Sequence, residues 1–207
     1  MEDIITKIDI EFIDTYLRNT GILYEDIRIE LVDQIAAEIE YRMSKGDSRG
    51  FYEVFKDYMI AHKTTLLKEN NKPFHWRIFK NLVRKFLKNL YSWQVILGSI
   101  ICFWVFEDIY SFFHTESAIR SFFPTLLMIM VMLIPSTVFG KKRFSFIGHF
   151  GILVTVFFSL NYYIIPYINH PSILYYGYLG LMAFLFVSSL KTMISLVIFY
   201  KKRFLIV

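Results

Sequence analysis

Two adjacent carboxylates and one arginine are the side chains of this sequence best placed for chemistry in an apolar setting. Glu107 and Asp108 end one strongly apolar segment, and Arg120 begins the next one after a short connection. Ionisable groups in such places either pair at a membrane surface or form an ion or proton site. Sites of the second kind are expected deeper and facing partners, so the interpretation favoured here is an outer-surface ion pair of Glu107 or Asp108 with Arg120.

No motif for a phosphate, a nucleotide or a catalytic metal occurs in the chain. HExxH, the P-loop and GxGxxG are missing, and the glycine pairs nearest to the last of these lie inside apolar segments. The five histidines are scattered, and the single cysteine, Cys102, lies in an apolar segment. We therefore expect no catalytic residue, no metal site and no cofactor, and we expect that the protein is not an enzyme.

Four apolar segments in the second half of the sequence are about as long as a bilayer requires. The 207 residues are 55% hydrophobic and 19% aromatic, with a mean hydropathy of +0.43. These values are typical of a multi-pass membrane protein rather than of a soluble domain. The predicted transmembrane domain covers residues 90–207, with spans at about 90–109, 120–139, 144–165 and from 173 onward.

The last of these segments leaves two alternatives open. It is apolar for about 18 residues before Lys191, which corresponds to about 27 Å of helix and barely spans a bilayer. Either Lys191 snorkels and the helix emerges near Tyr200, or the span ends near Lys191 and residues 192–199 lie along the surface.

Charge predicts the orientation. Residues 1–70 contain fifteen acidic and nine basic side chains, whereas residues 71–207 contain three acidic and fourteen basic ones. The basic clusters at 72–88, 141–143 and 201–203 alternate with two weakly charged loops. The positive-inside rule then places both termini in the cytoplasm, in a plasma (inner) membrane. Because the basic charge belongs to the membrane half, nucleic-acid binding is not predicted.

Residues 71–89 are predicted to form a basic, amphipathic helix at the membrane surface. Apolar residues from Trp76 to Leu90 recur at helical spacing, and the segment contains no acidic residue. Each basic side chain near anionic lipid contributes about 1 kcal/mol. The bilayer with anionic lipids is therefore an expected partner, bound through Lys72, Arg77, Lys80, Arg84, Lys85 and Lys88.

Residues 1–70 are predicted to form a cytoplasmic domain of three helices, so that the whole chain is all-α. Gly21 and Gly46 stand where helices at about 9–19 and 24–45 should end, and Asp47 or Ser48 is expected to cap the third helix. A bundle of this size is marginal alone. We expect it to associate with the membrane, with a second copy in a homo-oligomer, or with a partner.

The second helix of this domain carries a candidate docking face. Glu30, Asp33, Glu38 and Glu40 are predicted to be exposed on it. They are either an ordinary solvated face or a surface that steers a cytoplasmic regulatory protein, since several weak charges together accelerate association. A third alternative is that the acidic domain folds back onto the basic helix at 71–89.

The run DIRIELVDQIAAEIE within residues 26–40, with the small-residue turn after it, resembles the three-helix cytoplasmic module of HAAS-type membrane proteins. The resemblance covers about a quarter of the chain and carries no catalytic residues. It implies a regulatory or sensory membrane protein that works with a PadR-like transcription regulator. The predicted function is a non-enzymatic regulatory, sensory or protein-interaction role; the alternative is a small transporter or transporter subunit.

Overall fold

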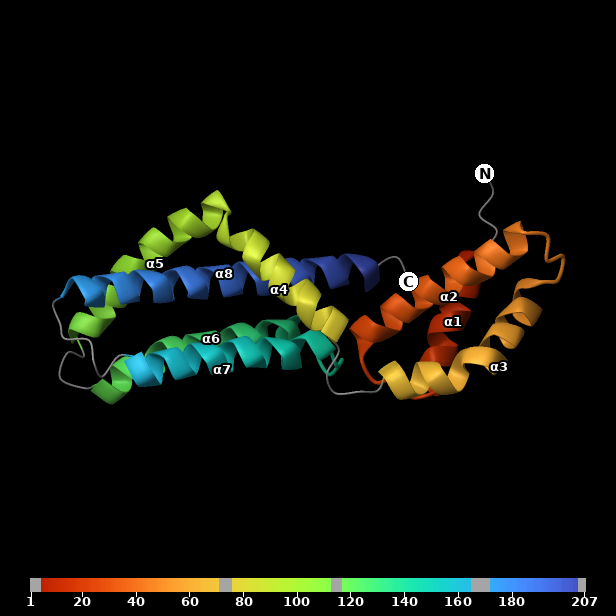
Figure 1. Cartoon of the computed structure of the whole chain (residues 1–207), viewed down its shortest axis with the longest axis horizontal. Coiled ribbons are helices and arrows are strands. Elements are labelled where there is room, and N and C mark those ends of the chain that lie inside the picture. The colour runs from red at the N-terminus through yellow and green to blue at the C-terminus, as the bar shows by residue number, and fades with distance from the viewer. Residues whose placement is uncertain (1–4, 71–75, 113–116, 165–171, 205–207) are drawn as a thin grey trace. The chain divides into compact units, whose positions relative to one another are not determined.

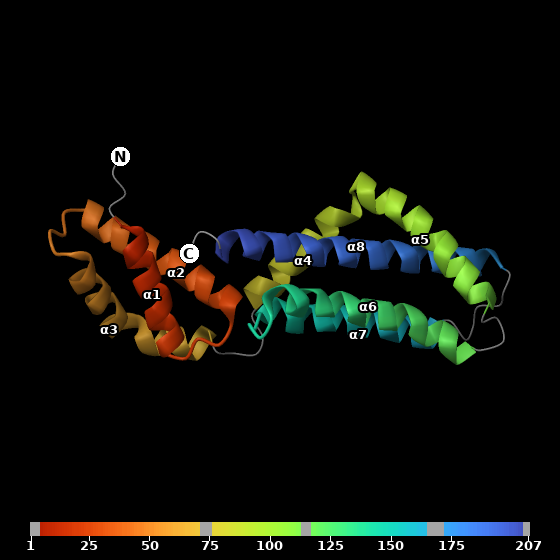
Figure 2. The same cartoon turned by 180° about the vertical axis from the view of Figure 1, so that it is seen from behind.

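The computed structural model describes residues 5–70, 76–112, 117–164 and 172–204 (Figures 1 and 2). Every regular element in these ranges is an α-helix, which confirms the predicted all-α class. The chain divides into two compact units. The N-terminal unit contains α1 (Lys7–Asn19), α2 (Glu25–Ser44) and α3 (Phe51–Asn70). The apolar unit contains α4 (Trp76–Leu90), α5 (Trp93–Phe112), α6 (Ser117–Phe139), α7 (Ser145–Ile164) and α8 (Ile173–Phe204).

Two short segments from later in the sequence also belong to the N-terminal unit. They are Lys142–Ser145, which ends at the first residue of α7, and the chain from Tyr200 onward, which includes the last turn of α8. The N-terminal unit is therefore built from three parts of the chain rather than from one continuous stretch.

The helix α1 begins with a capping box. The hydroxyl of Thr6 accepts a hydrogen bond from the backbone N–H of Asp9, and the Asp9 carboxylate accepts one from the Thr6 N–H at 2.9 Å. The helix ends before Gly21, whose φ of +91° lies in the left-handed region that favours glycine. This short element thus has sequence-encoded limits at both ends.

Packing in the N-terminal unit centres on α2, which contacts both α1 and α3. Apolar side chains that recur at helical spacing along α2 are buried, and Ile35 and Ile39 are fully inaccessible. Edge-on contacts from Phe12 and Tyr16 of α1 to Phe55 of α3 close the far side. The buried apolar side chains of the three helices include Ile13, Leu17, Ile27, Leu31, Ile35, Ile39, Val54, Phe55, Tyr58 and Met59.

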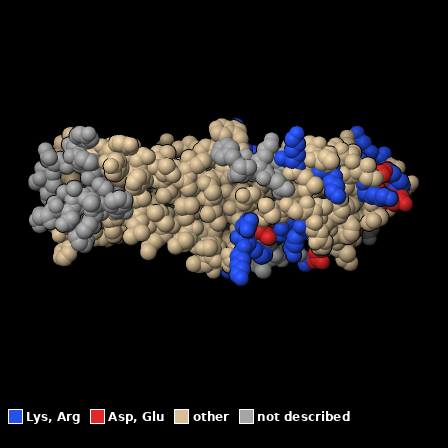
Figure 3. Space-filling view, turned by 90° about the horizontal axis from the view of Figure 1, so that it is seen from below, with Lys and Arg blue, Asp and Glu red and all other residues tan. Residues whose placement is uncertain are grey.

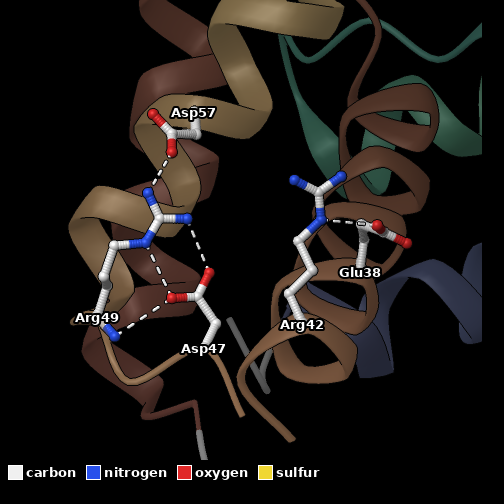
Figure 4. A network of polar contacts seen from close by, with 5 residues as sticks. All are labelled: Glu38, Arg42, Asp47, Arg49 and Asp57. Carbon is white, nitrogen blue, oxygen red and sulfur yellow. Dashed lines mark hydrogen bonds and ion pairs between the residues drawn. The ribbon is translucent and has the colours of Figure 1, made fainter. Parts of the chain in front are cut away.

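The turn between α2 and α3 is held by charge rather than by a helix cap (Figure 4). Gly46 has a φ of +101°, and Gly50 supplies the carbonyl that accepts from the first N–H groups of α3. Asp47 does not cap this helix as expected. Its carboxylate accepts hydrogen bonds from Nε and Nη2 of Arg49 at 2.9 and 2.8 Å, and Arg49 also pairs with Asp57.

In the apolar unit, α4 and α5 meet at a bend of 75°. One edge of the apolar arc of α4 is buried through Ile78 and Leu82, whereas Trp76 and Leu87 on the other edge are exposed. Phe79 lies 6.2 Å from the ring of His149 on α7. In the amphipathic helix predicted at 71–89, part of the apolar arc therefore packs on neighbouring helices and the rest is exposed.

Two helices, α7 and α8, are long and apolar enough to cross a membrane, and the bent pair of α4 and α5 makes a third if it is counted as one span. The apolar described part of α6 is shorter, Phe123–Phe139. On the face shown in Figure 3, a long stretch of the tan surface carries no Lys, Arg, Asp or Glu side chain. The apolar helices carry exposed apolar side chains, including Trp104, Met130 and Leu133.

The length of α8 decides between the two alternatives for the last apolar segment. This helix runs for 32 residues from Ile173 to Phe204 and passes Lys191 without ending. Its length is about 48 Å at 1.5 Å per residue, which exceeds the thickness of a bilayer core. Residues 192–199 thus continue the same helix and do not form a separate surface helix.

Neutral hydrogen bonds join the apolar helices to one another. The Tyr178 hydroxyl of α8 donates to Oδ1 of Asn161 on α7 at 2.6 Å, and Nδ2 of Asn161 donates to the carbonyl of Phe157. Asn89 of α4 donates to the hydroxyl of Thr192 on α8 at 2.9 Å. Such bonds between helices are the expected use of polar residues in an apolar setting.

The turn between α2 and α3 predicts a pH response. Hydrogen bonds from the Arg49 side chain lower the pKa of Asp47 from 3.8 to about 2. Because the folded pKa is depressed, this contact stabilises the turn above about pH 4 and is lost as the pH falls through about 2. NMR titration of the Asp47 carboxyl carbon in the detergent-solubilised chain should give a midpoint of about 2. Arg49→Gln should return it toward about 3.9.

Lys45→Gln is the matched control, because Lys45 lies over the Tyr41 ring and makes no bond to Asp47. It should leave the midpoint unchanged. An ordinary midpoint in the wild-type chain would contradict the predicted contact.

Candidate functional site

The candidate site is centred on the carboxylate of Asp26. Asp26 is in the first turn of α2 and is completely buried. Its Oδ1 accepts from the backbone N–H of Ser145 at 2.9 Å, and its Oδ2 accepts from the Ser145 hydroxyl at 2.6 Å. Because Ser145 is the first residue of α7, Asp26 binds N–H and hydroxyl donors at the positive end of that helix.

A backbone hydrogen bond lies beside this contact. The N–H of Glu25, the first residue of α2, donates to the carbonyl of Arg143 at 2.8 Å. We call Glu25, Asp26, Arg143 and Ser145 the α2–α7 junction. It joins residues that are far apart in the sequence, and all four belong to the N-terminal unit.

Arg28 holds the junction onto α1. The side chain is buried, its Nε donates to Oδ1 of Asp14 at 2.7 Å, and its Nη2 pairs with Glu25. Asp14 also accepts from Arg18 at 3.0 Å. A buried ion pair contributes little net stability but costs about 3–5 kcal/mol when one partner is removed. This network therefore fixes the start of α2 against α1.

The end of α8 enters the same unit. Tyr200 and Phe144 are both buried, and their ring centroids lie 5.6 Å apart. One turn later, Arg203 pairs with Asp33 of α2. The first residue of α7 and the last turn of α8 are thus both anchored to α2.

The four predicted docking carboxylates do not form one uniform free face. Asp33 pairs with Arg203, and Glu38 accepts from Nε of Arg42 at 2.8 Å within α2 (Figure 4). Glu30 is half-buried and Glu40 is exposed. The carboxylates of Glu38 and Glu40 lie toward the end of α2 that is away from the junction.

A groove between α2 and α3 adjoins Glu38. It has a volume of about 550 Å³ and is lined by Gln34, Ala37, Glu38, Tyr58, His62 and Leu66, among others. Arg42 lies 5.4 Å from the centroid of the Tyr58 ring, which is a cation–π distance. This groove, with its mixed polar and apolar lining, is the candidate recognition surface of the N-terminal unit.

The predicted lipid-binding cations lie mainly on the outside of α4. Arg77, Lys80, Arg84 and Lys88 are exposed, and Lys85 is half-buried with its ammonium 5.1 Å from the centre of the Phe199 ring. Lys72 lies outside the described residues. An exposed basic row beside the exposed Trp76 and Leu87 fits the side of an amphipathic helix that meets lipid headgroups.

The predicted outer ion pair is only partly described. Glu107 is half-exposed and Asp108 is exposed near the end of α5. The side chain of Arg120 lies outside the part of the structure that is described. The pairing of these three residues therefore stays a prediction.

Sequence reasoning missed the junction. Neither Asp26 nor Ser145 was among the candidate site residues predicted from the sequence. The available signal was weak: an acidic residue in the first turn of one helix and a serine at the start of another. Within the described residues, no group of three His, Cys, Asp or Glu side chains could hold a metal ion.

No protein-family model matches the chain, and the searches of curated proteins and of solved structures also find no match.

The junction predicts a local effect of Asp26 on α7. Asp26→Ala in the detergent-solubilised chain should speed amide hydrogen exchange in a peptide covering residues 144–149. Losing a hydrogen bond to a charged group costs about 1.5–3 kcal/mol, which corresponds to about tenfold or more in exchange protection. Asp26→Asn retains one acceptor oxygen and should give a smaller change.

Asp33→Ala serves as the matched control, because it removes an acidic residue of the same helix that pairs with Arg203 instead. Equal acceleration of the 144–149 peptide in both variants, or none in either, would contradict a specific role for Asp26.

Proposed function

We propose that this chain is a non-enzymatic, multi-pass membrane protein with a regulatory or sensory role, and that its N-terminal unit is a cytoplasmic module that recognises a protein partner. The single observation that carries the proposal is the burial of Asp26 against Ser145. The helix α7 continues from Ser145 as an apolar helix. A change in the packing of the cytoplasmic module is therefore transmitted along the backbone to a helix that crosses the membrane in this proposal.

The groove between α2 and α3 supplies the proposed recognition surface. Its lining offers Glu38 as an acidic group, Gln34 as an amide and Leu66 as an apolar contact. A cytoplasmic protein with a basic, partly apolar helix suits this combination. The HAAS-type resemblance implies that the partner is a PadR-like transcription regulator.

The four-span topology is part of this proposal. We assign the spans to α5, α6, α7 and α8, with α4 on the cytoplasmic surface and both termini in the cytoplasm of a plasma (inner) membrane. Support comes from the apolar character of α7 and α8 and from the basic residues on the outer side of α4. The 23 residues of α6 correspond to about 35 Å, enough to span, although Pro124 and Pro135 lie within it.

The transporter alternative needs polar groups that line a path. Asn161 and Tyr178, two buried polar residues of the apolar unit, are instead hydrogen-bonded to each other between α7 and α8. This pairing favours a packing role for both residues and supports the regulatory proposal over transport.

Cysteine labelling tests the topology. After Cys102→Ala, single cysteines at Ser48, Lys142 and Arg203 should be shielded from a membrane-impermeant maleimide in intact cells, and a cysteine at Ser117 should react. All four should react after permeabilisation. Labelling of Lys142→Cys in intact cells would contradict the four-span assignment.

A substitution that fills the groove between α2 and α3 tests whether this groove recognises a protein partner. Ala37 is exposed within the groove, so Ala37→Trp should occupy it with little effect on folding. In cells, a cross-linkable full-length chain should capture a cytoplasmic protein, and Ala37→Trp should reduce that capture about tenfold or more, as for loss of a central contact. Glu38→Gln combined with Glu40→Gln should weaken capture mainly at low salt.

Thr64→Trp is the matched control, because Thr64 is exposed on α3 and does not line this groove. It should capture the same protein as the wild type. Equal loss in both tryptophan variants, or capture that neither variant changes, would contradict recognition through the groove.

A further inference from the structure

Lys191 carries an uncompensated positive charge within α8. Its ammonium donates to Oε1 of Gln94 at 2.7 Å and to the hydroxyl of Ser92. Both acceptors are neutral. None of the ion pairs in the described part of the chain includes Lys191. The two oxygen atoms therefore hold the cation in place without neutralising it.

An apolar groove contains this cation. It has a volume of about 440 Å³ and runs between the start of α5 and the C-terminal half of α8, along Val95, Val187, Leu190, Ile194 and Ile198. The last two side chains are 42% and 50% exposed. A groove with one cation and an otherwise mainly apolar lining suits a ligand that has an anionic head and a hydrocarbon tail.

The start of α5 adds to the attraction for an anion. After the bend of 75°, α5 begins at Trp93, and Gln94 lies in its first turn. The N-terminus of a helix carries a partial positive charge and N–H groups without partners inside the helix. Gln94 also has an amide NH₂ group, which is able to donate while its oxygen accepts from Lys191.

The surroundings of the groove favour lipid over a water-soluble anion. Ile96, Leu97 and Ile100 on α5 and Phe199 on α8 are 44–53% exposed, and Trp93 is 67% exposed. Such a surface costs free energy in water and is matched by acyl chains, and tryptophan favours the headgroup level. The positive charge of Lys191 in the groove then selects for a net negative headgroup.

We propose that this groove binds one anionic phospholipid. Its phosphate contacts the ammonium of Lys191 and the amide of Gln94, and one acyl chain lies along Leu190 and Val187, toward the interior of the bilayer. The site is separate from the basic residues on the exposed side of α4, which meet the headgroup region without a groove. The inference rests on the proposed embedding of the chain in a membrane.

Native mass spectrometry of the full-length chain tests the site. The protein is purified in detergent and titrated with phosphatidylglycerol or with phosphatidylcholine. The wild type should retain one phosphatidylglycerol in preference to phosphatidylcholine. Lys191→Gln should weaken that retention about fivefold or more, as expected for one cation at a lipid headgroup, whereas Lys191→Arg should preserve it.

Two further variants separate the parts of the site. Leu190→Trp fills the apolar part of the groove that holds the acyl chain and leaves the charge in place, and it should also release the lipid. Lys88→Gln removes an equal charge from an exposed position on α4 and should leave the one retained lipid bound. If Lys88→Gln weakens lipid retention as much as Lys191→Gln does, the proposal is overturned, because the lipid is then bound by charge alone.

The remaining outcomes distinguish the two proposals. If alkaline carbonate releases the chain from membranes, the membrane embedding fails and this inference fails with it. If the chain stays in the membrane but retains both lipids equally, only the lipid site is overturned. Displacement of the lipid by inorganic phosphate, with no effect of Leu190→Trp, would identify a phosphate site and would likewise overturn the lipid site.

Discussion

The buried carboxylate of Asp26 is the constraint on which the N-terminal unit depends. An ionised carboxylate without partners cannot be buried at a tolerable cost, so this side chain requires donors. Ser145 supplies a backbone N–H and a hydroxyl, and both belong to the first turn of α7. The requirement acts in both directions, because the start of α7 also needs an acceptor for its unpaired N–H groups. Residues 142–145 are therefore part of the N-terminal unit, together with its three helices.

Contacts within the N-terminal unit also change the interpretation of the basic clusters. The basic clusters at 141–143 and 201–203 satisfy the positive-inside rule, yet Arg203 also pairs with Asp33, and the carbonyl of Arg143 accepts from Glu25. Acidic residues near the start and middle of α2 thus contact the protein's own chain. Toward the other end of α2, Glu38 pairs with Arg42 of the same helix beside the groove that contains Tyr58 and Leu66, and Glu40 is exposed. The proposed recognition surface therefore lies at the end of α2 that does not contact the start of α7 or the end of α8.

The apolar unit uses its polar groups differently. Asn161, Tyr178, Asn89 and Thr192 form neutral hydrogen bonds between helices, which cost little in an apolar setting because donors and acceptors are paired. Lys191 is the exception, since its acceptors are neutral and the charge persists. A close approach of α5 and α8 at Gly98, where a Cβ atom would lie 3.0 Å from Val187, sets the width of the groove beside that cation.

The sequence by itself determined the local features. Glycine chemistry predicted the ends of α1 and α2 at residues 21 and 46, and composition predicted long apolar helices. These features depend on a residue and its near neighbours. The third-helix cap was predicted wrongly because Arg49 competes for Asp47, and the continuity of α8 past Lys191 was left open because length alone allowed both outcomes. Only the tertiary structure decided that Asp26 meets Ser145, since no periodic pattern links two residues that are 119 positions apart.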